Sequence, residues 1–202
     1  MTQSKRTGTF TRIIACEVFR AALNYLKLED RYPGLRITYL PSRLHLKPLE
    51  LKEHLLREVK KARRRDDRII CIYGDCFPEI GDFCKQHGIM KVRGVNCYEM
   101  LLGSERFKQL LDEVTGTYFI EEGLITNFED YCMRPLELQD EEIRRQCFQH
   151  YERLLYIRQP SDPDLLSKAS ELAQFLGLSL EVDDVDYSYL EEELLKLLGR
   201  DL

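Results

Sequence analysis

The chain has 202 residues, of which 44% are hydrophobic and 32% charged, and its formal net charge is −5. These proportions are those of a globular protein and exclude a disordered, collagen-like or low-complexity chain. The length suits one α/β domain better than two full domains. We therefore expect a disordered tail over residues 1–11 and a single domain over residues 12–202.

No apolar run approaches the ~20 residues of a membrane span, and no signal-peptide core follows the first residues. We therefore expect a cytoplasmic protein with no membrane partner. The sequence leaves the oligomeric state open.

Charge is unevenly distributed along the chain, with a net +9 in residues 1–66 and −14 in residues 67–202. The basic excess peaks at Lys60-Lys61-Ala62-Arg63-Arg64-Arg65. Aromatic or glycine residues, which nucleic-acid sites place among their basic residues, are missing from this run. Cations also stabilise the C-terminal end of a helix. We interpret the run as a solvated helix end and expect no nucleic-acid partner.

In the first half of the chain, hydrophobic patterning predicts strands that alternate with helices. A short apolar run at 12–16 indicates a strand, and helical periodicity follows over 17–26. Alternation over 35–40 indicates a second strand, after which Pro48 suits the first position of a helix over 48–65. The uninterrupted apolar run at 68–73 is typical of a parallel strand buried on both faces.

The second half continues the pattern. We expect helices over 79–87, 96–102, 104–114, 140–151, 162–176 and 187–198, and strands over 90–93, 153–157 and 178–182. The aromatic segment 116–131 has no assignment. Alternating strands and helices predict a Rossmann-like α/β fold, a parallel sheet with helices on both faces. The strand–helix–strand–helix of about 152–198 is expected to extend the same sheet.

Common catalytic signatures are missing. The sequence has no Walker motif, no Gly-x-Gly-x-x-Gly after the first strand, no His-Glu-x-x-His and no Gly-x-Ser-x-Gly. Seven cysteines, an odd number at irregular spacing, do not form a disulfide framework. In a reducing compartment they are free thiols, metal ligands or catalytic groups. The sequence has no Cys-x-x-Cys pair, which argues against a thiol redox protein.

Four soft or borderline metal ligands lie at or just beyond the carboxyl ends of four successive predicted strands. Cys16 ends the first strand, His45 follows the second, Cys76 the third and Cys97 the fourth. Ligands of open parallel sheets bind outside the carboxyl ends of the strands, so these side chains could converge there. Three thiolates and an imidazole suit tetrahedral zinc, and three thiolates suit an iron–sulfur cluster with one open iron. Predicted helix N-termini near Cys16 and Cys97 would favour their thiolates.

The alternative is that the cysteines are small core hydrophobes, which buried free cysteines commonly are. We adopt that interpretation for Cys71, inside the third strand, and for the cysteines on or near helices, which are Cys84, Cys132 and Cys147. For Cys16, Cys76 and Cys97 both interpretations stay open.

Two short polar motifs also have structural explanations. Gly103-Ser104 separates two predicted helices and is explained by a C-cap glycine followed by an N-cap serine. Gly116-Thr117-Tyr118 is either a turn beside the same sheet edge or an ordinary loop.

Taken in order, these motifs resemble a bacterial and archaeal family catalogued only as a domain of unknown function. The resemblance spans about residues 12–200. Genes of that family often lie beside those of corrinoid proteins and of methylamine- or betaine-type methyltransferases. The residues that carry the resemblance are Cys16-Glu17, Leu44-His45-x-x-Pro48, Tyr73-Gly74-x-Cys76, Cys97-x-x-x-Leu101-Leu102-Gly103-Ser104 and Gly116-Thr117-Tyr118 with Gly123.

The resemblance implies that Cys16, His45, Cys76 and Cys97 share one metal- or cluster-binding site. We expect the motif residues Gly74, Gly103, Ser104, Gly116 and Tyr118 to line it as cofactor-binding residues. The implied role is corrinoid-linked methyl transfer, with a corrinoid as a further cofactor and a corrinoid protein or methyltransferase as partner. The alternative is a non-catalytic accessory module that binds a corrinoid or a partner without a metal.

The chain departs from the family pattern at several positions. Val95-Asn96 replaces a His-Asp pair, Leu46 replaces an asparagine, Phe77 a glycine and Leu124 a tryptophan. A shifted ligand preference or a lost activity would follow from such changes.

Overall fold

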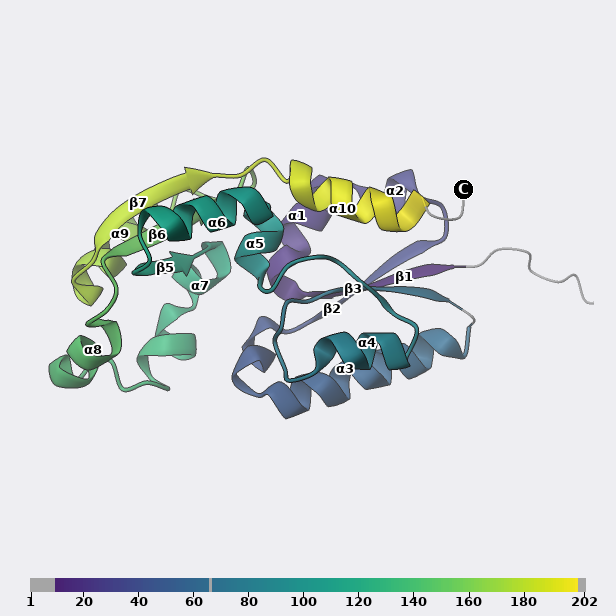
Figure 1. Cartoon of the computed structure of the whole chain (residues 1–202), viewed down its shortest axis with the longest axis horizontal. Coiled ribbons are helices and arrows are strands. Elements are labelled where there is room, and N and C mark those ends of the chain that lie inside the picture. The colour runs from purple at the N-terminus through teal and green to yellow at the C-terminus, as the bar shows by residue number, and fades with distance from the viewer. Residues whose placement is uncertain (1–9, 66, 200–202) are drawn as a thin grey trace, which may run out of the picture. The chain divides into compact units, whose positions relative to one another are not determined.

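The computed structural model of the protein describes residues 10–65 and 67–199 (Figure 1). Contacts group these residues into two compact units. The first unit holds the described residues up to 96 and those from 193 on, and the second holds residues 97–192. Most of the expected tail at 1–11 lies outside the described residues, and Thr11 already belongs to the first strand.

The first unit contains a parallel four-stranded sheet of order β2-β1-β3-β4. On the two central strands, β1 and β3, side chains are buried on both faces of the sheet. The buried residues include Ile13, Ile14, Ile70 and Ile72, which are all 0% exposed. That burial explains the uninterrupted apolar runs of the sequence. The strands are β1 (Thr11–Cys16), β2 (Leu35–Leu40), β3 (Arg68–Ile72) and β4 (Met90–Lys91).

Helices cover both faces of this sheet. Figure 1 shows α3 and α4 on one face and α1 on the other. The helices of the unit are η1 (Glu17–Phe19), α1 (Arg20–Tyr25), α2 (Leu28–Arg31), η2 (Ser42–Leu46), α3 (Pro48–Arg63) and α4 (Ile80–Gln86). Proline opens α3 as expected, because its fixed φ suits the first helical turn.

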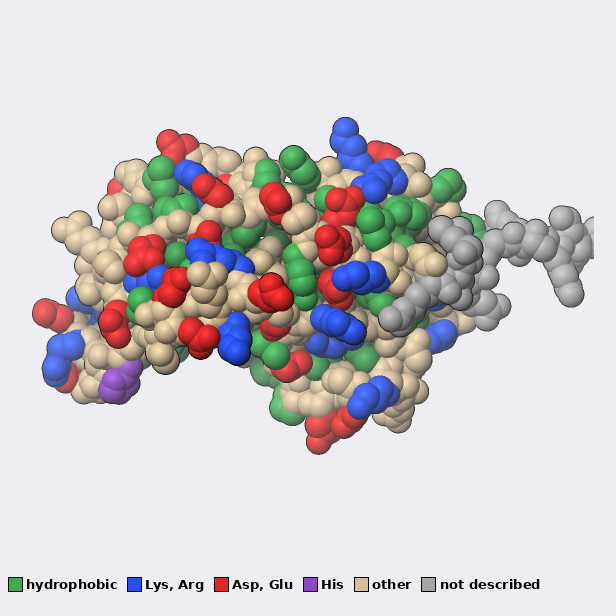
Figure 2. Space-filling model, turned by 45° about the horizontal axis from the view of Figure 1, so that its top comes forward, with side chains coloured by type: hydrophobic (Ala, Val, Ile, Leu, Met, Phe, Trp, Pro, Cys, Tyr) green, Lys and Arg blue, Asp and Glu red, His purple; other side chains and the backbone are tan. Residues whose placement is uncertain are grey.

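The basic run lies at the C-terminal end of α3, as predicted. Lys60, Lys61 and Arg63 occupy its last turn. The Arg63 guanidinium donates hydrogen bonds to the carbonyl oxygens of His87 (2.6 Å) and Gly88 (2.8 Å), which joins the ends of α3 and α4. On the face drawn in Figure 2, acidic and basic side chains are intermixed rather than gathered by sign.

The second unit has its own parallel sheet, of order β5-β6-β7. The expectation that the C-terminal strands extend the first sheet is therefore wrong. The strands are β5 (Thr117–Ile120), β6 (Arg153–Arg158) and β7 (Ser179–Asp184). The helices are α5 (Cys97–Leu102), α6 (Ser104–Glu113), α7 (Glu122–Thr126), a π-helical turn (Glu129–Met133), α8 (Glu141–Phe148), α9 (Leu166–Leu176) and α10 (Ser188–Leu198), which ends in the first unit.

Side chains on opposite faces of the second sheet contact different helices. Ile120, Leu154 and Tyr156 belong to a buried cluster with residues of α7, α8 and α9. Phe119 points to the other face, where its ring lies 5.1 Å from that of Phe107 on α6. Two parallel sheets with flanking helices confirm the α/β class.

None of the helices within these described ranges combines the length and apolar character needed to cross a bilayer. In the part of the chain that the structure describes, none of the seven cysteines forms a disulfide bond.

Candidate functional site

The candidate site lies at the carboxyl edge of the first sheet. Cys16 is the last residue of β1, His45 lies in η2 directly after β2, and Cys76 lies in the loop after β3. Pro41 precedes the short helix η2, in which buried Leu44 anchors the turn that carries His45. Because β1, β2 and β3 are parallel neighbours, these loops leave the sheet at one edge, as the sequence predicts.

One imidazole nitrogen faces two thiols. Nε2 of His45 lies 3.4 Å from Sγ of Cys16 and 4.0 Å from Sγ of Cys76. Cys16 is 2% exposed and Cys76 is half-buried, whereas His45 keeps an exposed flank. Three of the four side chains expected at the site are therefore brought together. We refer to Cys16, His45 and Cys76 as the thiol–imidazole cluster.

Burial sets the protonation states in the cluster. It raises the pKa of the Cys76 thiol to about 11, so the free thiol is protonated at neutral pH. Partial burial also lowers the pKa of the His45 imidazole. A neutral imidazole and a protonated thiol do not form an activated thiolate–imidazolium pair. They are nevertheless good metal ligands once the thiol proton is released.

Gly74 lets the loop that carries Cys76 approach a second segment of the first unit. A Cβ at position 74 would lie 2.4 Å from the carbonyl oxygen of Val95 and 2.5 Å from Cα of Asn96. The backbone N–H of Asp75 donates a 2.7 Å hydrogen bond to that Val95 oxygen. Gly74 thus has a structural role, since it leaves room for backbone against backbone. A role in binding a cofactor stays a prediction.

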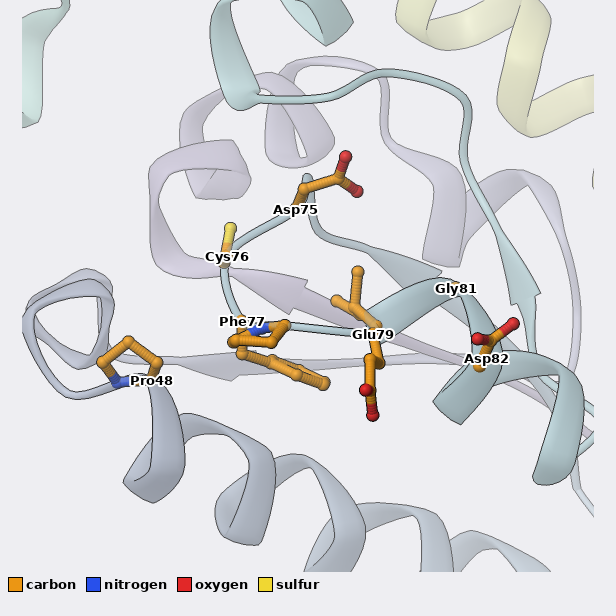
Figure 3. Close-up of a pocket in the computed structure, with 9 residues that line it drawn as sticks. Pro48, Asp75, Cys76, Phe77, Glu79, Gly81 and Asp82 are labelled. Atoms are coloured by element: carbon orange, nitrogen blue, oxygen red, sulfur yellow. The ribbon is translucent and has the colours of Figure 1, made fainter.

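A pocket of about 630 Å³ borders the same loop. Figure 3 shows that the Cys76 thiol and the Asp75 carboxylate project to one side of the loop, away from Phe77 and the Glu79 carboxylate. Phe77 is 3% exposed and packs edge-to-face on Phe83, with the ring centroids 5.6 Å apart. The pocket is lined by Pro48, Asp75, Cys76, Phe77, Pro78, Glu79, Ile80, Gly81 and Asp82.

Tyr73 is a site residue that the sequence analysis did not single out. It follows β3 directly, is 1% exposed, and its ring centroid lies 6.5 Å from that of His45. The available signal was its position in the Tyr73-Gly74-x-Cys76 motif at a strand end.

The fourth expected ligand, Cys97, is the first residue of α5 and is half-buried. It belongs to the second unit, so its membership of the site stays a prediction. Within residues 10–65 and 67–199, no group of three or more His, Cys, Asp or Glu side chains is already arranged to hold a metal ion.

Gly103 and Ser104 make contacts within the second unit. Gly103 has a φ of +83° and precedes α6 at the N-cap position, and Ser104 is the first helical residue rather than the cap. The Ser104 hydroxyl donates to the Glu99 carboxylate at 2.6 Å and lies 3.2 Å from the Tyr189 hydroxyl. These contacts account for both residues structurally, and cofactor binding by them stays a prediction.

Both interpretations of Gly116-Thr117-Tyr118, a turn beside the first sheet's edge and an ordinary loop, are wrong for its last two residues, because Thr117 begins β5. Gly116 therefore lies at the amino edge of the second sheet, opposite the edge at which such sheets bind ligands. A Cβ there would lie 2.6 Å from the carbonyl oxygen of His150, so a close backbone approach explains the glycine. The Tyr118 hydroxyl lies 3.6 Å from Sγ of Cys132.

Comparison with known proteins identifies a family for the chain. No curated protein and no solved structure shows detectable similarity to the chain. The sequence model of one family matches residues 39–194, a segment that includes His45, Cys76 and Cys97 and begins after Cys16. Since that segment covers most of the chain, the protein belongs to the family described as protein of unknown function (DUF1638).

Proposed function

We propose that the first unit binds a transition-metal ion through the thiol–imidazole cluster, with zinc as the first candidate. The observation that carries this proposal is the pair of distances from His45 Nε2, 3.4 Å to Cys16 Sγ and 4.0 Å to Cys76 Sγ. Zinc binds thiolate sulfur at about 2.3 Å and imidazole nitrogen at about 2.0–2.1 Å, so two such ligands at a tetrahedral angle lie about 3.6 Å apart. The observed distances lie on either side of that value.

The site would be open rather than closed. Binding would require the Cys76 thiol to lose its proton and move closer to His45, which agrees with the lack of a preformed ligand group among the residues described. Three protein ligands leave a fourth position for Cys97 or for an exogenous ligand, as in catalytic zinc sites. A metal held in this way supplies Lewis-acid chemistry.

An iron–sulfur cluster is the second candidate, after zinc, for the group bound at this site. A cluster with one open iron needs three thiolates, so it would require Cys97 in addition to Cys16 and Cys76. Inorganic sulfide and iron in the purified protein would distinguish it from zinc.

A narrower proposal is a role in corrinoid-linked methyl transfer, and only the resemblance supports it. A thiolate substrate held at the site would attack the methyl carbon of a methylcorrinoid. A sulfur–carbon bond would form, and the electron pair of the cobalt–carbon bond would stay on cobalt as Co(I). Thiol-dependent conversion of methylcobalamin to the Co(I) form, followed by its visible spectrum, tests this step.

The alternative function is a non-catalytic accessory module without a metal. The pocket of about 630 Å³ beside Cys76 favours it. Such a module would bind a corrinoid or a partner protein.

Metal analysis of the full chain, purified without oxygen, tests the main proposal. We expect about one zinc per chain, and a large loss of it in Cys16→Ser and Cys76→Ser, because a serine hydroxyl is a far poorer ligand than a thiolate at neutral pH. Cys147→Ser is the matched control, since Cys147 is an exposed cysteine on α8. Equal metal in all four proteins would refute the cluster as the site, and the absence of metal from the wild type would favour the accessory module.

A further inference from the structure

Two core cysteines of the first unit contact each other through their side chains. Cys71 lies within β3 and is 0% exposed, and Cys84 lies on the buried face of α4 and is 3% exposed. The two thiols share a hydrogen bond. The backbone around β4 holds both in place: Cys71 is paired in register with Lys91, and the N–H of Ile89 donates to the Cys84 carbonyl oxygen at 2.8 Å.

The two thiols of this pair differ in acidity. The hydrogen bond from the Cys71 thiol lowers the pKa of Cys84 most, burial opposes it, and the Lys91 ammonium, on a side chain 19% exposed, lowers the pKa further. The same hydrogen bond, together with complete burial, raises the pKa of Cys71. Cys84 is therefore the nucleophile of the pair, because the thiolate is the form of cysteine that attacks.

We infer that Cys71 and Cys84 form a reversible disulfide when the protein meets a peroxide. The Cys84 thiolate attacks one oxygen of hydrogen peroxide, so a sulfur–oxygen bond forms, the oxygen–oxygen bond breaks, and the departing hydroxide takes up a proton to leave as water. Cys71 then loses its proton and attacks the sulfur of the Cys84 sulfenic acid, which forms the disulfide and releases a second water. Two electrons pass from the thiols to the peroxide, and a dithiol reductant reverses the reaction by exchange.

Access to the pair runs through α4. That helix has seven residues, and its outer side, formed by Gly81, Asp82, Lys85 and Gln86, is exposed. Helices this short have little stability of their own, so local opening of α4 exposes Cys84 while the sheet stays folded. Hydrogen peroxide needs only a small opening, unlike a bulky disulfide such as oxidised glutathione. The burial of the pair therefore favours a peroxide as the oxidant.

The disulfide would join the two ends of the segment that forms the pocket. Residues 71–84 include Cys76 and every residue that lines the pocket except Pro48. A closed loop has fewer conformations than an open one, so the bond restricts the motions of this segment. Oxidation should therefore slow amide hydrogen exchange in residues 75–81 and raise the melting temperature by several degrees. Neither Cys71 nor Cys84 belongs to the thiol–imidazole cluster, so these effects do not require a bound metal.

Peptide mapping of the full wild-type chain tests the disulfide directly. The folded protein is treated with an equimolar amount of hydrogen peroxide, its remaining thiols are blocked with iodoacetamide, and it is cleaved after lysine and arginine and before aspartate. These cuts place Cys71, Cys76 and Cys84 in separate peptides, 69–74, 75–81 and 82–85. We expect peptides 69–74 and 82–85 to be joined, with the mass of their sum less two hydrogens, and to separate after treatment with dithiothreitol.

Two controls show whether the fold directs the reaction. In protein unfolded by urea the contact is lost, and Cys76 is nearer in sequence to both partners, so the yield of the joined peptides should fall several-fold. Cys84→Ala should abolish the rise in melting temperature on oxidation. Cys132→Ala is its matched control and should keep that rise, because Cys132 is a half-buried thiol of the second unit.

Each adverse result has a definite meaning. A folded wild type in which peptides 69–74 and 82–85 are not joined, or in which Cys76 takes the place of either partner, would overturn the disulfide. Equal yields from folded and unfolded chains would overturn it as well, because the contact would then not direct the reaction. Unchanged hydrogen exchange in protein that carries the disulfide would overturn its effect on the pocket segment.

Discussion

Cys71 is expected to be a structural thiol, so replacing it tests whether the metal ligands are assigned correctly. It lies within β3, is 0% exposed, and shares a hydrogen bond with the thiol of Cys84. Cys71→Ala should therefore keep the bound metal and lower the free energy of unfolding by about 1–2 kcal/mol, because it leaves a small cavity in the core. Metal content and urea unfolding of the same sample measure both effects. A folded Cys71→Ala protein that had lost its metal would show that the ligands are assigned wrongly.

Cys97 is the residue whose role in the site is still a prediction. If it is a ligand, Cys97→Ser should weaken metal binding by at least about tenfold. A loss of that size already results from changing a residue that only hydrogen-bonds to a metal ligand. The fold should change little, since serine is nearly isosteric with cysteine and Cys97 is half-buried at the start of α5. Metal content in the presence of a chelator and the melting temperature decide the question. A lower melting temperature with unchanged metal would assign Cys97 to the core instead.

Single residues differ in how far the sequence could predict them. Cys16, His45 and Cys76 were predictable because parallel strands end at one edge, so residues just beyond neighbouring strands meet. Tyr73 was not, because its place beside His45 depends on packing between distant segments.

Among the loops, the one that carries Cys76 depends on Gly74 for its position. Gly74→Ala would place a methyl group 2.4 Å from the Val95 carbonyl oxygen, which is backbone and cannot move as a side chain can. We expect a loss of about 1–3 kcal/mol of stability, the usual cost of overpacking, and weaker metal binding because the displaced loop carries Cys76. Urea unfolding and metal titration measure the two effects.

Gly81→Ala is the control for that substitution. Gly81 also lines the pocket but lies within α4, and a Cβ there would meet no atom within 4 Å. Alanine should raise stability by about 0.5–1 kcal/mol through its higher helix propensity and leave metal binding unchanged. If the two alanine variants behaved alike, close packing at Gly74 could not be the cause.

Most elements were predictable from apolar periodicity, and the exceptions have physical causes. The expected strand at 35–40 matches β2 residue for residue. The strand β5 escaped assignment because it has only four residues and places aromatic side chains on both faces, which hides the alternation. The expected helix at 162–176 begins only at Leu166, since Asp162 instead accepts hydrogen bonds from Tyr156 and from the backbone N–H of Gln159.

At the scale of the whole molecule, the division into two sheets could not be predicted from the sequence. Periodicity predicts that a segment is a strand but does not specify its neighbour. Here β5 pairs with β6 and β4 pairs with β3, and β4 is only two residues long. Pairing depends on which helices share a buried cluster, and Ile120, Leu154 and Tyr156 share theirs with α7, α8 and α9.

The stability of the whole chain should depend on pH through Glu121, which follows β5. Its carboxylate accepts hydrogen bonds from the backbone N–H groups of Gly123 (2.7 Å) and Leu124 (2.8 Å), yet the residue is only 5% exposed. Burial outweighs these bonds and raises the pKa to about 7 from an ordinary value of 4.5. The folded protein therefore binds more protons than the unfolded chain between these values, so the free energy of unfolding should fall as pH rises through this interval and level off above it.

Glu121→Gln removes the titrating group and keeps one acceptor oxygen, while its NH2 group faces the other of the two backbone N–H groups. The variant therefore loses a hydrogen bond at every pH, which lowers its stability by an amount that does not depend on pH. Relative to this variant, the wild type should lose up to about 3 kcal/mol of stability between about pH 4.5 and pH 7, because one pKa unit corresponds to about 1.4 kcal/mol. Urea unfolding of both proteins over that range measures the difference and cancels the contributions of every other titrating group. Parallel curves would show that Glu121 titrates alike in the folded and unfolded chains, and a wild type that gained stability with pH would mean that its carboxylate is stabilised in the fold rather than penalised by burial.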